Sequence, residues 1–115
     1  MKFTFDAVFY YVSNLDRAVR FYRDVLGFKL HSQDCVARFY LGDVLFELVP
    51  TSDIAKLQGH GNARLCLQVE DIRASISELR GKGVVSEDSE TKQNGVLASF
   101  RDPDGNEVCL WQYTH

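Results

Sequence analysis

The amino-acid sequence predicts an α+β fold in which two tandem β-α-β-β-β modules make up a single domain. The chain has 115 residues, which suits one ordinary domain but is too short for two independent cores. Its hydrophobic content of 45% and charged content of 25% are typical of a globular protein. The same order of strand-like and helix-like segments occurs twice, which indicates a duplication. We place the first module at residues 3–50, a linker at 51–62 and the second module at 63–115.

The first module begins with the apolar run 7–12, whose aromatic and β-branched content favours a strand. Either Ser13 or Asn14 can cap the helix that follows. Apolar residues then recur at three- and four-residue spacing up to Gly27, a pattern typical of one helix face ended by a left-handed glycine. Three further strands are predicted near 28–33, 36–41 and 44–49.

The second module repeats these events in the same order. Residues 64–69 alternate between polar and apolar side chains, which indicates an amphipathic strand. Asp71 is expected to cap a helix that ends at Gly81 and Gly83. Further strands are predicted near 84–87, 95–101 and 107–113, and residues 102–106 form a strong turn sequence.

Charge and composition exclude several classes of function. The net charge is −3, with 16 acidic and 13 basic residues scattered along the chain, so no basic patch for nucleic acid is expected. No apolar run approaches the roughly 20 residues that cross a bilayer, and the first residues do not resemble a signal peptide. We expect no nucleic-acid partner and no membrane association.

The three cysteines, Cys35, Cys66 and Cys109, are an odd number without a C-x-x-C motif. This pattern predicts neither a disulfide framework nor a zinc ribbon, and it favours a reduced, cytoplasmic setting. Each cysteine is interpreted as a small buried hydrophobe.

Four segments of the chain resemble recurrent signatures of one protein family. They are Tyr11–Tyr22, Val25–Phe28, Val69–Ile72 and Phe100–Asn106, and together they span nearly the whole chain. In their order and separation they are similar to the vicinal oxygen chelate superfamily, which contains glyoxalases, bleomycin-resistance proteins and extradiol dioxygenases. The resemblance implies curved mixed sheets that form a cleft, usually completed in a homodimer. It is specific for the fold and weak for the reaction, since these residues are caps, helix faces and turns.

The resemblance also implies where a metal would be held. In the metal enzymes of the family, each module gives one ligand from its first strand and one from its last. These positions carry Ala7, Glu47, Arg64 and Cys109 in this chain. Ala7 has no donor atom, and Arg64 is a permanent cation that would repel a metal. We therefore expect no metal and no cofactor.

The three histidines do not restore this site in the predicted register. His31 is expected on an edge strand, His60 in the linker and His115 at the terminus. A rearranged site made of His60, Glu47 and Cys109 remains an alternative.

Strand alternation assigns the side chains that face the implied cleft. The candidate ligand-binding residues are one acid, one base, two thiols and four aromatic residues, and the aromatic side chains suit a flat or hydrophobic ligand. Filling of the cleft or of a dimer interface by the same rings is an equal alternative. The first strand also places Phe5 and Ala7 on this face. The candidates are Phe9, Tyr11, Glu47, Arg64, Cys66, Cys109, Trp111 and Tyr113.

Glu47 and Arg64 are expected to form a mutual salt bridge in place of the metal, because a buried charge without a partner is costly. The functional alternative is that Arg64 binds a ligand carboxylate or phosphate, or that Glu47 binds a ligand cation. Cys66 and Cys109 are expected on neighbouring strands, either simply buried or as a two-thiol site.

The leading hypothesis for function is metal-independent binding of a small aromatic or amphipathic molecule in the cleft of a homodimer, with an antibiotic as one candidate ligand. A metal-dependent lyase, isomerase or dioxygenase with a rearranged site is the alternative. A structural or interaction module and a metal-free enzyme that uses Glu47 as a base also remain open.

Overall fold

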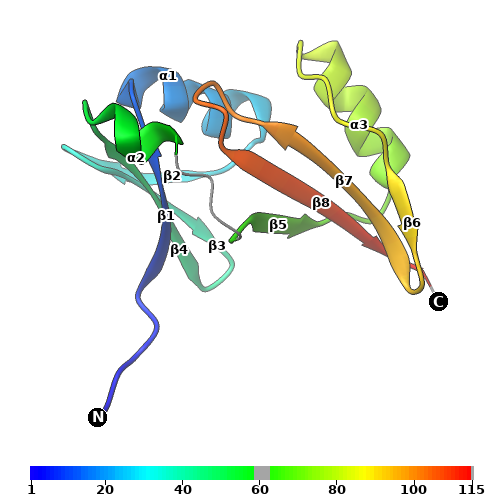
Figure 1. Cartoon of the computed structure of the whole chain (residues 1–115), viewed down its shortest axis with the longest axis horizontal. Helices are drawn as coiled ribbons and strands as arrows, with labels where there is room; N and C mark the ends of the chain where they lie inside the picture. Colours follow the sequence, from blue (N-terminus) through cyan, green and yellow to red (C-terminus); the bar gives the residue numbers. More distant parts are fainter. Residues whose placement is uncertain (59–62, 115) are drawn as a thin grey trace. The chain divides into compact units, whose positions relative to one another are not determined.

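The computed structural model describes residues 1–58 and 63–114 of the chain. It divides the chain into two compact units, residues 1–59 and 60–115. Each unit contains one four-stranded sheet, and the two sheets have equivalent strand orders, β1-β4-β3-β2 and β5-β8-β7-β6 (Figure 1). The repeated β-α-β-β-β modules predicted from the sequence are therefore confirmed.

The helices and strands have the following bounds. The first unit contains β1 (Ala7–Val12), α1 (Leu15–Arg20), the π-helix η1 (Phe21–Val25), β2 (Leu30–Gln33), β3 (Ala37–Leu41), β4 (Val44–Pro50) and α2 (Ile54–Gln58). The second contains β5 (Leu65–Gln68), α3 (Ile72–Gly81), β6 (Glu90–Lys92), β7 (Gly95–Arg101) and β8 (Glu107–Tyr113). Within the described part of the chain, every helix is too short and too polar to cross a membrane.

The first strand of each unit runs parallel to the last one, and the other neighbours are antiparallel. A parallel pair needs a long connection, and in each unit the helix and the two middle strands together supply it. The register places Phe9 opposite Glu47 in the first sheet and Cys66 opposite Cys109 in the second.

Both crossover helices begin at the caps expected from the sequence. The Asn14 side chain accepts a hydrogen bond from the Arg17 backbone N–H at 2.9 Å, and Asp71 accepts one from the Ala74 N–H at 3.1 Å. Each of these bonds satisfies a backbone donor that the first turn leaves without a helical partner. Of the two candidate caps in the first module, Asn14 therefore fills the role.

The first helix is not a continuous α-helix, which corrects the expectation from its apolar spacing. The α-helix ends at Arg20, and residues 21–25 form a wider π-helical turn in which the Leu26 N–H donates to the Phe21 carbonyl at 3.1 Å. The wider turn accompanies burial of Phe21, which is 8% exposed and which the α-helical pattern did not include. The end at Gly27 is as predicted, with a φ of 77°.

An aromatic cluster forms the core of the first unit. The Tyr22 ring is completely buried, and its centroid lies 5.1 Å from that of Phe46, 5.7 Å from Phe28 and 6.4 Å from Phe39. These rings join η1 to β3 and β4 by burial of large apolar areas. The other buried residues around them are Val12, Ala18, Val19, Ala37 and Leu48.

The core of the second unit is aliphatic apart from Phe100, which is 1% exposed. The Ile72 N–H at the start of α3 donates to the Gln112 side chain at 2.7 Å, which adds a polar link between α3 and β8. The remaining apolar core residues are Leu65, Ile72, Leu79, Ala98, Val108 and Leu110.

Two expectations about strand positions are wrong, and the predicted linker contains a helix. The strand expected at 84–87 lies instead at β6, because the turn before Gly95 sets the register by pairing Lys92 with that residue. The expected linker contains α2, whose Ala55 N–H donates to the Asp53 side chain at 3.0 Å. Phe5 precedes β1 and is 72% exposed. Residues 59–62 of the linker, including His60, and the terminal His115 lie outside the described residues.

The predicted turn at residues 102–106 joins β7 to β8 around a buried carboxylate. Asp102 is 5% exposed and accepts hydrogen bonds from the Asp104 N–H, the Asn106 N–H and the Asn106 side chain, all at 2.9 Å. Gly105 takes a φ of 84°, the left-handed region that favours glycine. Backbone donors thus stabilise a buried charge that would otherwise be costly.

Replacing Asp102 with alanine should destabilise the protein by about 2–4 kcal/mol, because buried donors lose a charged acceptor. Urea unfolding measures this free energy. The matched control is Asp88→Ala, at an exposed carboxylate, for which we expect a change within about 0.5 kcal/mol. Equal losses for the two variants would contradict this role of the turn.

Candidate functional site

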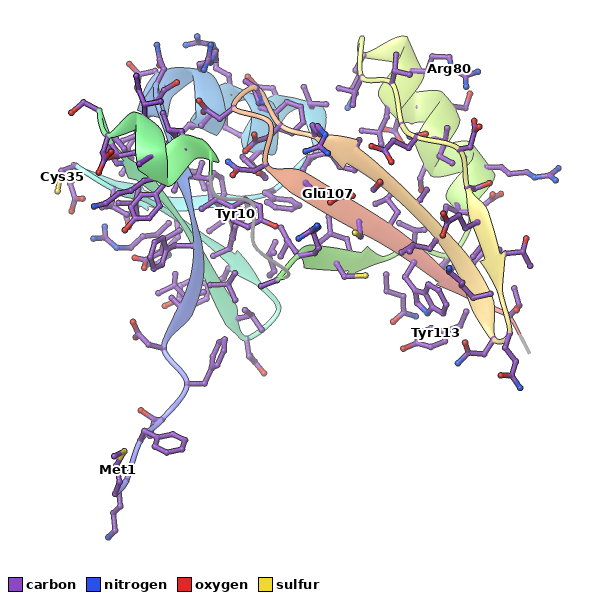
Figure 2. The ribbon with its side chains drawn as sticks, viewed as in Figure 1. Met1, Tyr10, Cys35, Arg80, Glu107 and Tyr113 are labelled. Atoms are coloured by element: carbon purple, nitrogen blue, oxygen red, sulfur yellow. The ribbon has the colours of Figure 1, made fainter. Side chains whose placement is uncertain are left out.

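Each sheet has one face packed under its helix and an opposite face, which we call the open face. On the packed faces Val12, Phe46 and Val108 have no exposed area, whereas Phe9 and Tyr113 on the open faces are 47% and 51% exposed. Figure 2 shows the Tyr113 side chain on the side of β8 that faces away from α3. The division of faces predicted from strand alternation therefore agrees with the structure.

An ion pair lies on the open face of the first sheet. The Arg38 Nε atom is 3.4 Å from a carboxylate oxygen of Glu47, its register partner on the neighbouring strand. Arg38 also donates to Asp34 at 3.2 Å and to the Ser32 hydroxyl at 3.4 Å. Arg38 was not among the predicted site residues. Its place in the predicted strand 36–41, facing the strand that carries Glu47, is a signal that could have identified it.

A second ion pair lies at the start of β8 and joins Arg64 to Glu107. The hydrogen bond from Arg64 lowers the pKa of the Glu107 carboxyl, while partial burial opposes this shift. The pair therefore stabilises the fold above the usual pKa of a glutamate, and this contribution is lost as the pH falls through the lowered value. Glu47 and Arg64 each face an opposite charge within their own unit, and the predicted salt bridge between them stays a prediction.

The structure brings Cys66 and Cys109 together on the open face of the second sheet, as expected. They are register partners on β5 and β8. Burial raises the pKa of both thiols, and the negative charge of Glu107 adds to the increase at Cys109. Cys109 is buried, but Cys66 and Cys35 are exposed, so the interpretation of all three as buried hydrophobes is wrong for two of them.

Aromatic side chains share the first open face with the ion pair, and Phe9 is the register partner of Glu47. The rings of Phe9 and Tyr11 meet edge to face, with their centroids 5.2 Å apart. The Lys56 ammonium of α2 lies 5.1 Å above the Tyr11 ring centre, within the range of a cation–π interaction. Tyr40, which sequence reasoning missed, is 49% exposed, and its ring centroid lies 5.0 Å from that of His31.

Trp111 and Tyr113 form a second aromatic group on the open face of β8. Their ring centroids are 5.6 Å apart in an edge-to-face arrangement. The indole lies against the backbone of Gly95 on β7, where an added Cβ would come within 2.7 Å of Trp111 Cε2. Gly95 is therefore a site residue that sequence reasoning missed, since its signal is only a glycine at the start of a predicted strand.

The first unit also has a surface hollow of about 440 Å³ where β4 leads into α2. Hydroxyl and apolar side chains line it, and none of the predicted site residues does. Its lining residues are Ser13, Pro50, Thr51, Ser52, Ile54 and Leu57.

Comparison with known proteins identifies the family. Residues 4–110 match the model of the Glyoxalase/Bleomycin resistance protein/Dioxygenase superfamily. Because the match covers nearly the whole chain, this protein belongs to that superfamily. No curated protein matches the chain.

Solved structures of the same fold cover almost the whole chain. TnmS3, an antibiotic binding protein from Streptomyces sp. CB03234, is 24% identical, with a TM-score of 0.82 and coverage of 99% of each chain. Lactoylglutathione lyase from Agrobacterium tumefaciens is 19% identical, with a TM-score of 0.78 and coverage of 95% and 92%. The fosfomycin resistance protein FosX from Mesorhizobium loti is 16% identical, with a TM-score of 0.76 and coverage of 99% and 95%. At these identities the likeness shows the fold.

The residues present do not fit the divalent metal that the family resemblance implies. Of the four family positions, Ala7 has no donor, and Arg64 is a cation paired with Glu107. Glu47 already faces the Arg38 guanidinium, and the fourth position is a thiol with a raised pKa. Within residues 1–58 and 63–114, no three His, Cys, Asp or Glu side chains are grouped as metal ligands. Catalytic divalent metals are usually held by about three protein ligands.

Gly95→Ala should displace the Trp111 indole and destabilise the fold by about 1–3 kcal/mol, because the methyl group has no room. Tryptophan emission and urea unfolding report the two effects. Gly81→Ala is the matched control, since a methyl group there meets nothing within 4 Å. If Gly95→Ala left both the emission and the stability unchanged, the indole would not lie where the structure has it.

Alkylation should distinguish the three thiols. Near neutral pH, iodoacetamide should modify the exposed Cys35 first and the buried Cys109 last, as measured by mass spectrometry of peptides. Because burial raises the pKa of Cys66 and Cys109, their rates should keep rising at a pH where an ordinary thiol has levelled off. Equal rates at Cys35 and Cys109 in the folded protein would contradict this order.

Proposed function

We propose that this protein binds a small aromatic or amphipathic molecule on its open sheet faces, without a metal ion and without chemical conversion. The observation that carries the proposal is the ion pair of Glu47 with Arg38 on a sheet face that also carries the rings of Phe9 and Tyr11. A carboxylate that faces a guanidinium is a poor metal ligand, whereas the rings beside it offer area for stacking.

The aromatic groups supply the contact area in this proposal. Phe9 and Tyr11 serve on the first open face, and Trp111 and Tyr113 on the second. A flat ligand that stacks on an exposed aromatic side chain gains binding free energy. Each well-placed ring pair contributes roughly 0.5–1.5 kcal/mol beyond the contribution of the buried area. The backbone contact with Gly95 holds the Trp111 indole against β7, which reduces the ordering cost of binding.

The two ion pairs give the ligand its orientation. Arg38 and Glu47 offer both signs of charge side by side, as do Arg64 and Glu107. A ligand carboxylate or phosphate can compete for a guanidinium, and a ligand amine for a carboxylate. The proposed ligand is therefore an aromatic compound with at least one polar or charged substituent.

An antibiotic fits this description, and sequestration needs no catalytic group. TnmS3, an antibiotic binding protein of the same fold, supports the proposal by analogy. We further propose that the protein acts as a homodimer in the cytoplasm and has neither a nucleic-acid nor a membrane partner.

Fluorescence of the single tryptophan, Trp111, tests the proposal directly. Bleomycin, the planar cation ethidium and the anion 8-anilinonaphthalene-1-sulfonate serve as aromatic probes of different charge. At least one probe should quench the emission with saturation and raise the midpoint of thermal unfolding, because a ligand that binds only the folded state stabilises it.

Variants then locate the binding site by calorimetric titration of the same probe. Phe9→Ala or Tyr113→Ala should weaken binding about three- to tenfold, which corresponds to about 0.5–1.5 kcal/mol for a lost ring contact. Phe3→Ala removes an aromatic side chain that is 85% exposed and precedes β1, so it should leave binding unchanged. The proposal would be contradicted if no probe quenched the emission or stabilised the protein. Equal losses of affinity in Phe3→Ala and in the two open-face variants would also contradict it.

A further inference from the structure

Two thiols stand side by side on the open face of the second sheet. Cys66 and Cys109 are direct partners in the parallel register of β5 and β8. Partners on neighbouring strands point to the same face, and the strands lie roughly 4.7–4.9 Å apart. Cys66 is exposed, so the pair is reachable from solvent even though Cys109 is only 9% exposed.

This spacing suits a metal ion that takes two thiolates in a line. A thiolate–metal bond is roughly 2.3 Å long, so a linear sulfur–metal–sulfur unit spans about 4.6 Å. Neighbouring strands are spaced at a similar distance, so two cysteine side chains that project from the same face can place their sulfur atoms about this far apart. Thiolate ligands select soft ions, of which Cu(I) accepts such low coordination.

The surroundings of the two thiols also favour a cation of low coordination number. Glu107 lies two residues before Cys109, and Arg64 lies two residues before Cys66. Both charges reach the Cys109 thiol, and because they form an ion pair they leave little net charge beside the site. Within the described residues, no group of three or more potential ligands is present, which disfavours a tetrahedral Zn²⁺ site here. Ser99, the register partner of Cys109 on β7, contributes only a hydroxyl.

We propose that Cys66 and Cys109 form a two-thiolate binding site for Cu(I) on the open face of the second sheet. On binding, the two S–H bonds break, two protons pass to solvent and two S–Cu bonds form. Copper enters and stays as Cu(I), so no electron acceptor or donor is needed. The copper site uses neither the aromatic residues nor Glu47. Its existence is therefore independent of the proposed binding of an aromatic ligand.

Competition for Cu(I) tests this site. The whole protein, reduced and stripped of metal, is titrated without oxygen into the coloured Cu(I)–bicinchoninate complex. The chain should withdraw one equivalent of Cu(I), and bound Cu(I) should protect Cys66 from alkylation by iodoacetamide. Cys66→Ser and Cys109→Ser should each abolish the withdrawal, whereas Cys35→Ser, at an exposed thiol in the other unit, should leave it unchanged.

Circular dichroism and thermal unfolding establish that the variants fold. Because Cys109 is buried, Cys109→Ser is the variant that is most at risk of misfolding. If it does not fold, the result for the exposed Cys66→Ser tests the site by itself. Two results would overturn the site: retention of all Cu(I) by bicinchoninate in the presence of the unmodified protein, or equal withdrawal by Cys66→Ser and the unmodified protein. Withdrawal of Cu(I) should be unaffected by Phe9→Ala, a variant on the other sheet that should weaken binding of the aromatic probes, and this separates the two tests.

Discussion

The alternation of side chains along the strands is the constraint on which the rest of this structure depends. In each sheet one set of side chains is buried beneath a helix, so the other set is left on the open face. Phe46 and Glu47 are neighbours in the sequence, yet one is fully buried in the aromatic core and the other lies in an ion pair. A shift of one residue in register would reverse these roles, and the packed core prevents it.

The ion pairs show how charged side chains on the open faces satisfy one another. A carboxylate in a half-buried position needs a partner, and each sheet supplies an arginine from a neighbouring strand or from the residue just before one. Arg38 and Arg64 therefore hold Glu47 and Glu107 within separate units. The divalent site implied by the family has neither the donors nor the free carboxylate that it requires, although the fold is shared with metal enzymes.

Sequence reasoning predicted the fold well because its signals are local. The caps at Asn14 and Asp71, the glycine after the first helix and the turn around Asp102 each depend on a few neighbouring residues. Periodicity also separated the packed from the open faces, since burial follows directly from the pleat.

Other features depend on contacts that a single segment does not specify. The π-helical turn accompanies the burial of Phe21 against the sheet, and the position of β6 follows from the register of its hairpin. The ion pair of Glu47 with Arg38 was not predicted, because Arg38 lies on a different strand and only the register of β3 with β4 brings the two residues together. The packing of the Trp111 indole against Gly95 likewise depends on the pairing of two strands, so the sequence of either strand alone does not reveal it.

Calorimetric titration of chelator-stripped protein with Ni²⁺, Co²⁺, Mn²⁺, Fe²⁺ and Zn²⁺ tests the central claim that Glu47 serves an ion pair and not a metal. The account predicts no stoichiometric binding tighter than about 10 μM, which corresponds to roughly 7 kcal/mol. Tight binding of one divalent ion per chain that is lost in Glu47→Ala would contradict it and would restore a metal-dependent enzyme.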